Sequence, residues 1–126
     1  KIELIVRGVC ALIPGIAGVS QNITVRSVVG RFLEHTRIFY FYNHGAEDLY
    51  LSSADWMYRN LYKRIEICFP ILNPKIKKRI IKEALKYYLK DYSQGWLMNA
   101  DGSYRKGRSK QGFSAQRALM NDYTLD

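Results

Sequence analysis

Residues 30–66 contain the side chains best suited to chemistry on a phosphate group. His35 and Arg37 lie two residues apart, where an apolar run begins. If that run is a strand, its alternation places both side chains on one face. A turn of small residues at 52–55 follows, and Arg59 and Arg64 come shortly after it. A histidine can transfer a proton and guanidinium groups can neutralise phosphoryl charge, so this region predicts a phosphate-handling site.

Length and composition indicate one globular domain or part of one. The chain has 126 residues, of which 48% are hydrophobic and 25% charged. No run approaches the roughly 18 apolar residues of a membrane span. The chain starts at Lys1 without a methionine, so we expect a piece of a longer protein. Cys10 and Cys68 are expected to be buried free thiols, and their spacing from the two histidines does not suggest zinc.

The positive charge is concentrated in the C-terminal part of the chain. The net charge is +9. Residues 1–72 carry eight Lys and Arg against six Asp and Glu, whereas residues 73–126 carry twelve against five. Such an excess can attract polyanions, but it also suits an ordinary solvated surface.

Hydrophobic periodicity predicts an alternation of strands and helices around these residues. We expect an amphipathic helix over 22–34, because Val25, Val28 and Phe32 follow helical spacing. Its end near His35 would place the imidazole beside the negative end of the helix dipole. Asn73 and Pro74 predict the start of a second helix, which runs to Gly95. The remaining expectations are strands at 2–6, 38–42, 49–51 and 64–69, a loop at 10–19, turns at 43–45 and 101–102, a short helix at 55–61, and irregular or partly disordered structure from Gln94 onward.

The pair of motifs around His35 and the small-residue turn resembles the phospholipase D superfamily signature. In that signature a His-x-Lys strand and a downstream Gly-Ser-Ala-Asn turn build half of a phosphate site. Here the corresponding residues are His-Thr-Arg at 35–37 and Ser-Ser-Ala-Asp at 52–55. This chain departs from the pattern at Arg37, which replaces the lysine, and it lacks the aspartate that usually follows.

A longer series of motifs resembles the C-terminal catalytic domain of bacterial polyphosphate kinase, the type with a phosphohistidine intermediate. The resemblance covers about residues 1–92 and recurs weakly at 101–104. Its motifs, in order, are Val6-Arg7-Gly8-Val9-Cys10, Pro14-Gly15, Gly18-Val19-Ser20, Asn22-Ile23, Val29 to His35, and Tyr50 to Met57. The turn at 42–46 departs from the family's usual Glu-Asn-Gly-Gly-Asp.

The resemblance implies an α/β fold of the phospholipase D type, a mixed β-sheet flanked by helices. Residues 1–92 would form the core of the catalytic subdomain and residues 93–126 a basic extension. The implied activity is reversible transfer of the terminal phosphate of ATP to polyphosphate. Arg7 would contact the nucleotide phosphates, His35 would be the second active-site histidine, and Arg37 would line the phosphate site.

The resemblance also implies what this chain would lack. The phosphorylated histidine, the Mg²⁺ ligands and the nucleotide-stacking tyrosine would belong to other domains of the same enzyme, so the isolated fragment should not turn over. ATP or ADP, polyphosphate and those remaining domains are the expected partners, in a homo-oligomer. We expect no specific nucleic acid and no transmembrane segment. The expected location is the cytoplasm, and peripheral association with a membrane is the alternative.

Two other function classes stay open. A phospholipase D-like nuclease could complete its site by dimerisation, with His35 as nucleophile, and a basic module could bind polyanions without catalysis. Individual residues also have structural explanations: Arg7 could pair with Glu34, and Arg37 could bridge to Glu66. Ser52, Ser53 and Asp55 are expected to close and cap a turn rather than touch substrate.

Overall fold

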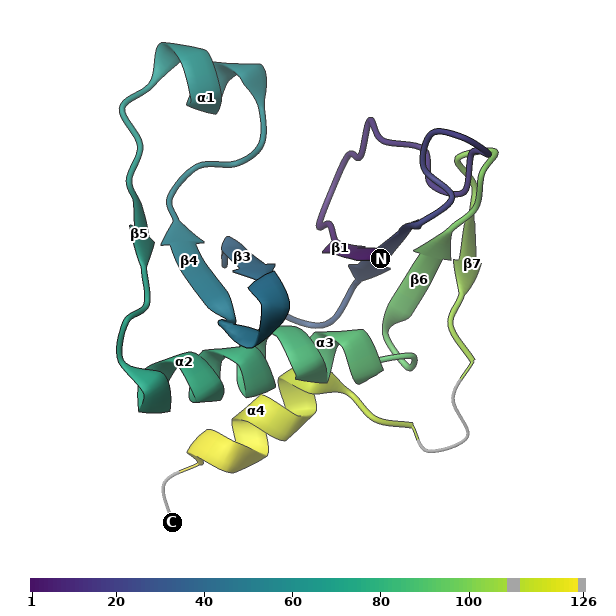
Figure 1. The fold of residues 1–126 in the computed structure, drawn as a ribbon. Coiled ribbons are helices and arrows are strands. Elements are labelled where there is room, and N and C mark those ends of the chain that lie inside the picture. Colours follow the sequence, from purple (N-terminus) through teal and green to yellow (C-terminus); the bar gives the residue numbers. More distant parts are fainter. Residues whose placement is uncertain (109–111, 125–126) are drawn as a thin grey trace. The chain divides into compact units, whose positions relative to one another are not determined.

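The chain folds into two compact units in the computed structural model, which describes residues 1–108 and 112–124 (Figure 1). The first unit combines Lys1–Glu34 with Leu85–Asp126, and the second is His35–Ala84. The division falls directly before His35, so Arg7 belongs to the first unit and His35 to the second.

The first unit is built on a four-stranded mixed sheet. Its strands are β1 (Ile2–Ile5), β2 (Ile23–Val28), β6 (Gly95–Met98) and β7 (Tyr104–Lys106), in the order β1-β2-β6-β7. β1 and β2 are parallel, with Ile2 opposite Ile23, and the other neighbours are antiparallel. Val28, Tyr88 and Ala115 form the buried core of this unit. The predicted strand at 2–6 and the predicted loop at 10–19 are confirmed.

The predicted helix over 22–34 was wrong, because residues 23–28 form the central strand β2. Its β-branched residues favour a strand, and backbone hydrogen bonds to β1 and β6 pair it on both sides. Val25 and Val28 of this strand stand three residues apart, a spacing that a helical period also fits. Arg26 on this strand is buried and donates from Nη1 to the Leu89 carbonyl at 2.6 Å. The helix dipole expected beside His35 therefore does not exist.

The second unit contains a three-stranded antiparallel sheet. β3 (Ile38–Phe41) and β4 (Asp48–Ser52) form the predicted hairpin, with Ile38 opposite Leu51 and a 3₁₀ turn, η1 (Asn43–Gly45), between them. β4 also pairs with β5 (Cys68–Pro70), which is shorter than the predicted strand at 64–69. The short helix α1 (Tyr58–Lys63) starts three residues later than predicted. Leu49 on β4 is the buried apolar centre of this sheet.

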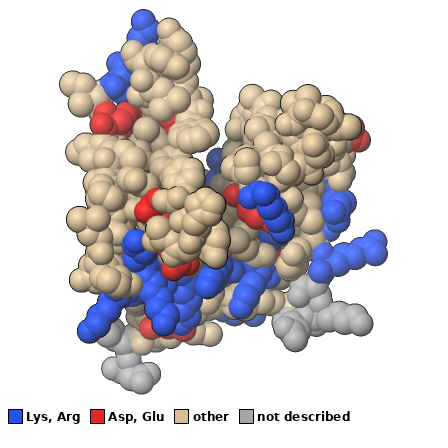
Figure 2. Space-filling view, viewed as in Figure 1, with Lys and Arg blue, Asp and Glu red and all other residues tan. Residues whose placement is uncertain are grey.

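The predicted helix start at Asn73 and Pro74 is confirmed. α2 (Pro74–Ile80) begins with the Asn73 side chain accepting hydrogen bonds from the backbone N–H groups of Lys75 and Ile76. α2 is followed by a π-helical stretch, η2 (Ile81–Lys86), and by α3 (Tyr87–Lys90). Figure 2 shows lysine and arginine side chains gathered over α2.

The helix ends at Lys90 and not at Gly95, because Gly95 opens β6. The carbonyl oxygen of Asp91 would lie only 2.2 Å from a Cβ at position 95. Only glycine, which has no Cβ, allows the two backbone segments to come this close. The expected irregular structure from Gln94 onward was also wrong for the described residues. They form β6, the confirmed turn at Asp101 and Gly102, β7, and α4 (Ala115–Tyr123). Positions 109–111 and 125–126 of that stretch lie outside the described residues.

The two cysteines are free, as expected, but they are not both buried. Cys10 is half-buried and Cys68 is exposed. Cys68 is exposed because β5 lies at the edge of its sheet, where its three residues face solvent. Among the residues that the structure describes, no helix has the length and apolar character needed to cross a bilayer.

Candidate functional site

His35 and Arg37 precede β3 directly, and the small-residue turn at 52–55 follows β4. The hairpin brings the two segments together, since the Ser52 N–H donates to the Arg37 carbonyl at 3.0 Å. Arg37 Nε donates to Asp55 Oδ1 at 2.8 Å. The partner of Arg37 is therefore Asp55 and not the Glu66 considered from the sequence.

Several positive charges surround the Asp55 carboxylate. The hydrogen bond from Arg37 lowers the pKa of Asp55 below its ordinary value, and the charges of Arg37, His35 and Arg59 act in the same direction against a partial desolvation. The charged side chains of residues 35–37 and of residues 52–59 therefore lie close enough to interact with one another. His35 itself is exposed, which leaves its imidazole accessible to an anion.

The turn after β4 is closed by its own serines. Ser52 Oγ accepts from the Ala54 N–H at 3.1 Å and donates to the Ile67 carbonyl at 3.1 Å. Ser53 Oγ accepts from the Ile67 N–H and donates to Glu66. The prediction that these serines close the turn is confirmed, whereas Asp55 binds Arg37.

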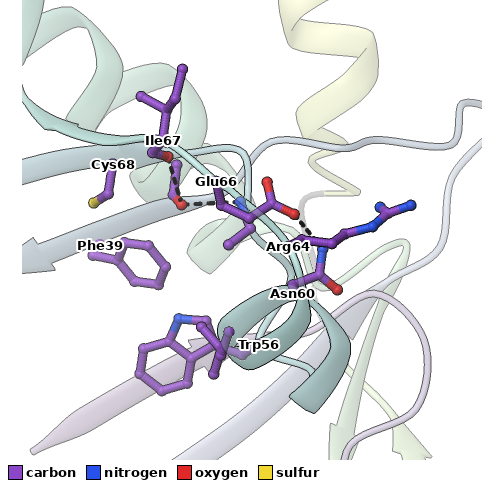
Figure 3. A pocket seen from close by; sticks show the side chains of 10 residues that line it. Phe39, Trp56, Asn60, Arg64, Glu66, Ile67 and Cys68 are labelled. Carbon is purple, nitrogen blue, oxygen red and sulfur yellow. Dashed lines mark hydrogen bonds between the residues drawn. The ribbon is translucent and has the colours of Figure 1, made fainter.

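Glu66 is held next to this turn by two side-chain hydrogen bonds. It accepts from Ser53 and, at 2.8 Å, from Asn60 Nδ2, and these hydrogen bonds lower the pKa of its carboxyl, with smaller contributions from Arg64 and Arg37. Figure 3 shows Glu66, Asn60 and Arg64 along the rim of a hollow that the Phe39 and Trp56 rings also line. These two rings stack with centroids 5.4 Å apart. The hollow therefore combines an aromatic wall with one cation and one anion.

Arg7 lies in the loop that follows β1 and is exposed. Glu34, its structural alternative as an ion-pair partner, instead accepts a hydrogen bond from Tyr88. Within residues 1–108 and 112–124, Arg7 forms no ion pair with an acidic side chain. Its charge is available to a phosphate, while its convergence with His35 on one phosphate stays a prediction.

The segment that leads into His35 is anchored by residues that the sequence did not single out. Gln116 on α4 accepts from the Phe32 N–H at 3.0 Å and donates to the Phe32 carbonyl at 2.9 Å. Tyr88 binds the Glu34 carboxylate, and Gly30 leaves room for the Gln116 side chain. These contacts fix residues 30–34 within the first unit. Partners more than fifty positions away leave no local signal in the sequence.

The described residues do not fit a metal site of their own. No group of three or more His, Cys, Asp or Glu side chains among residues 1–108 and 112–124 could hold a metal ion. The nearest carboxylates to the candidate site, Asp55 and Glu66, are each engaged by a side-chain donor.

The family described as Polyphosphate kinase C-terminal domain 2 matches residues 1–118. This chain belongs to that family. It is 57% identical over 124 residues to the polyphosphate kinase of Paraburkholderia phytofirmans, covering 98% of this chain and 18% of that protein. It is 61% identical over 109 residues to the polyphosphate kinase of Burkholderia lata, covering 86% of this chain and 16% of that protein.

A solved structure confirms the expected fold class. The crystal structure of polyphosphate kinase from Porphyromonas gingivalis superposes with a TM-score of 0.91 at 38% identity, over 97% of this chain and 19% of that one. The phospholipase D-like α/β expectation holds, although the strands divide between two sheets. The chain spans less than a fifth of the length of these relatives.

Proposed function

We propose that this chain is part of an ATP–polyphosphate phosphotransferase and supplies one side of its active site. Family membership over residues 1–118 carries the proposal. The reaction breaks the bond between the terminal phosphorus of ATP and its bridging oxygen. The phosphoryl group passes through a phosphohistidine to an oxygen at the end of polyphosphate, and ADP leaves. The phosphorylated histidine belongs to another domain of the enzyme.

His35 is proposed to hydrogen-bond the transferring phosphate and to assist transfer by donating or accepting a proton. An imidazole has one ring nitrogen that can donate a proton and one that can accept it, which suits this exchange in both directions of a reversible reaction. The exposure of His35 and its place beside Arg37 and Asp55 support this role.

Arg37 can bind phosphate while it remains paired with Asp55. Its Nε is used by Asp55, but a guanidinium has five N–H donors, and its two terminal nitrogens can still meet phosphate oxygens. The carboxylate then holds the guanidinium in one orientation. Arg7 is proposed to contact the nucleotide phosphates through its guanidinium, which pairs with no carboxylate among the described residues.

The proposal includes partners beyond this chain. ATP or ADP and polyphosphate are the substrates, and Mg²⁺, held by other domains of the enzyme, would offset phosphate charge. The same enzyme is proposed to be a cytoplasmic homo-oligomer without a specific nucleic-acid partner.

The test is ATP-dependent polyphosphate synthesis by the full-length enzyme that contains this chain. Arg7→Ala and Arg37→Ala are each expected to weaken ATP or polyphosphate use by at least about tenfold in kcat/KM, since each removes a charge-assisted contact. Arg105→Ala on β7, outside the candidate site, is the matched control and should retain the wild-type value.

Phosphodiester cleavage distinguishes the open alternatives. Metal-independent cleavage of DNA that depends on His35, without polyphosphate synthesis, would contradict the proposal in favour of the nuclease. Polyphosphate binding without transfer, unchanged in the Arg7 and Arg37 variants, would contradict it in favour of a binding module.

A further inference from the structure

The second unit exposes many large apolar side chains between Trp56 and Leu72. Ile65 is fully exposed, Tyr62 is 72% exposed and Leu72 is 81% exposed. The set, which we call the α1–β5 surface, comprises Trp56, Met57, Tyr58, Leu61, Tyr62, Ile65, Ile67, Phe69 and Leu72. Exposed apolar residues scattered singly are ordinary, but a gathering of this kind marks an interaction surface.

Positive charge is less dense on this segment than on α2. Between Trp56 and Leu72 four of the seventeen residues are charged, one of them acidic (Arg59, Lys63, Arg64 and Glu66), whereas four of the seven residues of α2 are basic. Figure 2 shows mainly uncharged surface over the arm formed by α1 and β5, in contrast to the basic side chains over α2. The α1–β5 surface therefore suits a protein partner better than a polyanion.

A buried acceptor lies within this surface. Asn60 is only 4% exposed, and its Nδ2 donates to Glu66 at 2.8 Å, as Figure 3 shows. Its Oδ1, which is itself buried, accepts no hydrogen bond from the part of the chain that the structure describes. The Asn60–Glu66 hydrogen bond joins α1 to the segment before β5 and so fixes the exposed apolar side chains on either side of it.

The length of the relatives indicates what covers the surface. In the Porphyromonas gingivalis enzyme the matching fold is 19% of a single chain, and in the curated relatives the match is 16–18%. More than four-fifths of each enzyme thus lies outside the part represented here. We propose that the α1–β5 surface docks against the remaining domains of the same polypeptide, which cover its exposed apolar side chains.

Cys68 provides a test that needs no substitution. Its thiol is exposed on β5, beside Ile67 and Phe69. In the full-length enzyme under native conditions, alkylation of Cys68, followed by mass spectrometry, is expected to be at least about tenfold slower than in the denatured enzyme, since docking covers the thiol. Alkylation of native Cys68 at the denatured rate would overturn the proposal.

A photo-crosslinking amino acid in place of Ile65 identifies the occupant. Because Ile65 is fully exposed in this chain, the replacement should not disturb the unit itself. Crosslinks from position 65 to residues of the same polypeptide outside this chain would support the proposal. Crosslinks to a second copy, or to residues 1–126 alone, would overturn it. The same probe at Ile76 on α2 is the control, and it should not crosslink to the same residues.

The two kinds of failure are separable. Loss of Cys68 protection with normal polyphosphate synthesis would refute the docking surface alone. A protected Cys68 in an enzyme that makes no polyphosphate would refute the proposed function and leave the docking surface in place.

Discussion

Arg37 and Asp55, eighteen residues apart, are joined by a hydrogen bond of 2.8 Å between Nε and Oδ1. The β3–β4 hairpin makes this pairing possible, because it returns the chain from the residues before β3 to the turn after β4. The pair connects the segment of His35 with the small-residue turn. Asp55 is thus a positioning residue for the guanidinium in the proposed site.

Replacing Asp55 with Asn should weaken the positioning of Arg37 without removing the cation. We expect kcat of polyphosphate synthesis by the full-length enzyme to fall about tenfold, which corresponds to about 1.4 kcal/mol in the transition state. Glu47→Gln, at the far end of the same hairpin, is the control and should retain the wild-type kcat. A wild-type kcat in Asp55→Asn, with a large loss in Arg37→Ala, would show that the ion pair does not position Arg37.

Gln116 should matter for the segment that precedes His35. Its side chain is 7% exposed and satisfies both backbone groups of Phe32. Gln116→Leu leaves these groups without their partner and should lower the free energy of unfolding by about 2 kcal/mol, measured by urea denaturation. Gln21→Leu, at an exposed loop position, should be close to neutral. Equal stability of the two variants would contradict this role for Gln116.

Local sequence patterns predicted those elements that residues close together in the sequence determine. The β3–β4 hairpin follows from an aromatic run, a turn containing Gly45 and a returning run, and the start of α2 follows from Asn73 and Pro74. β2 was misread because its burial comes from β1 and β6, which pair with it from distant positions. The tail appeared irregular because its glycine and charged residues obscured β6 and β7, which are stabilised by pairing with each other and with β2.

The sequence motifs predicted part of the candidate site but not the residues that anchor it. His35, Arg37 and the turn at 52–55 were identified from residue types and spacing, and the structure brings Arg37 to Asp55. The anchors Gln116 and Tyr88 were not, since their contacts span 84 and 54 residues. The residues next to a glutamine or tyrosine in a helix do not indicate that its side chain contacts a distant segment.

Tyr88 should make the first unit sensitive to alkaline pH. Burial, together with the hydrogen bond to Glu34 and its negative charge, raises the pKa of Tyr88 well above that of an ordinary phenol. Because the folded pKa is raised, this contribution to stability is complete below pH of about 10 and declines as the pH rises above it. Tyr88→Phe removes the ionisable hydroxyl while keeping the ring.

The difference in unfolding free energy between wild type and Tyr88→Phe should therefore be largest at pH 7 to 9 and should shrink above pH of about 10. Urea denaturation across this range measures it. Tyr42→Phe, at an exposed position, is the matched control and should follow the wild type. A difference that stays constant up to pH of about 11 would contradict the assignment.

The central claim is that His35 assists phosphoryl transfer in an enzyme whose phosphorylated histidine lies elsewhere. The most direct measurement is the rate of ATP-dependent polyphosphate synthesis by full-length His35→Ala, alongside circular dichroism to confirm folding. We predict a loss of at least about 100-fold in kcat with the fold intact. A folded His35→Ala enzyme that makes polyphosphate at the wild-type rate would contradict the account.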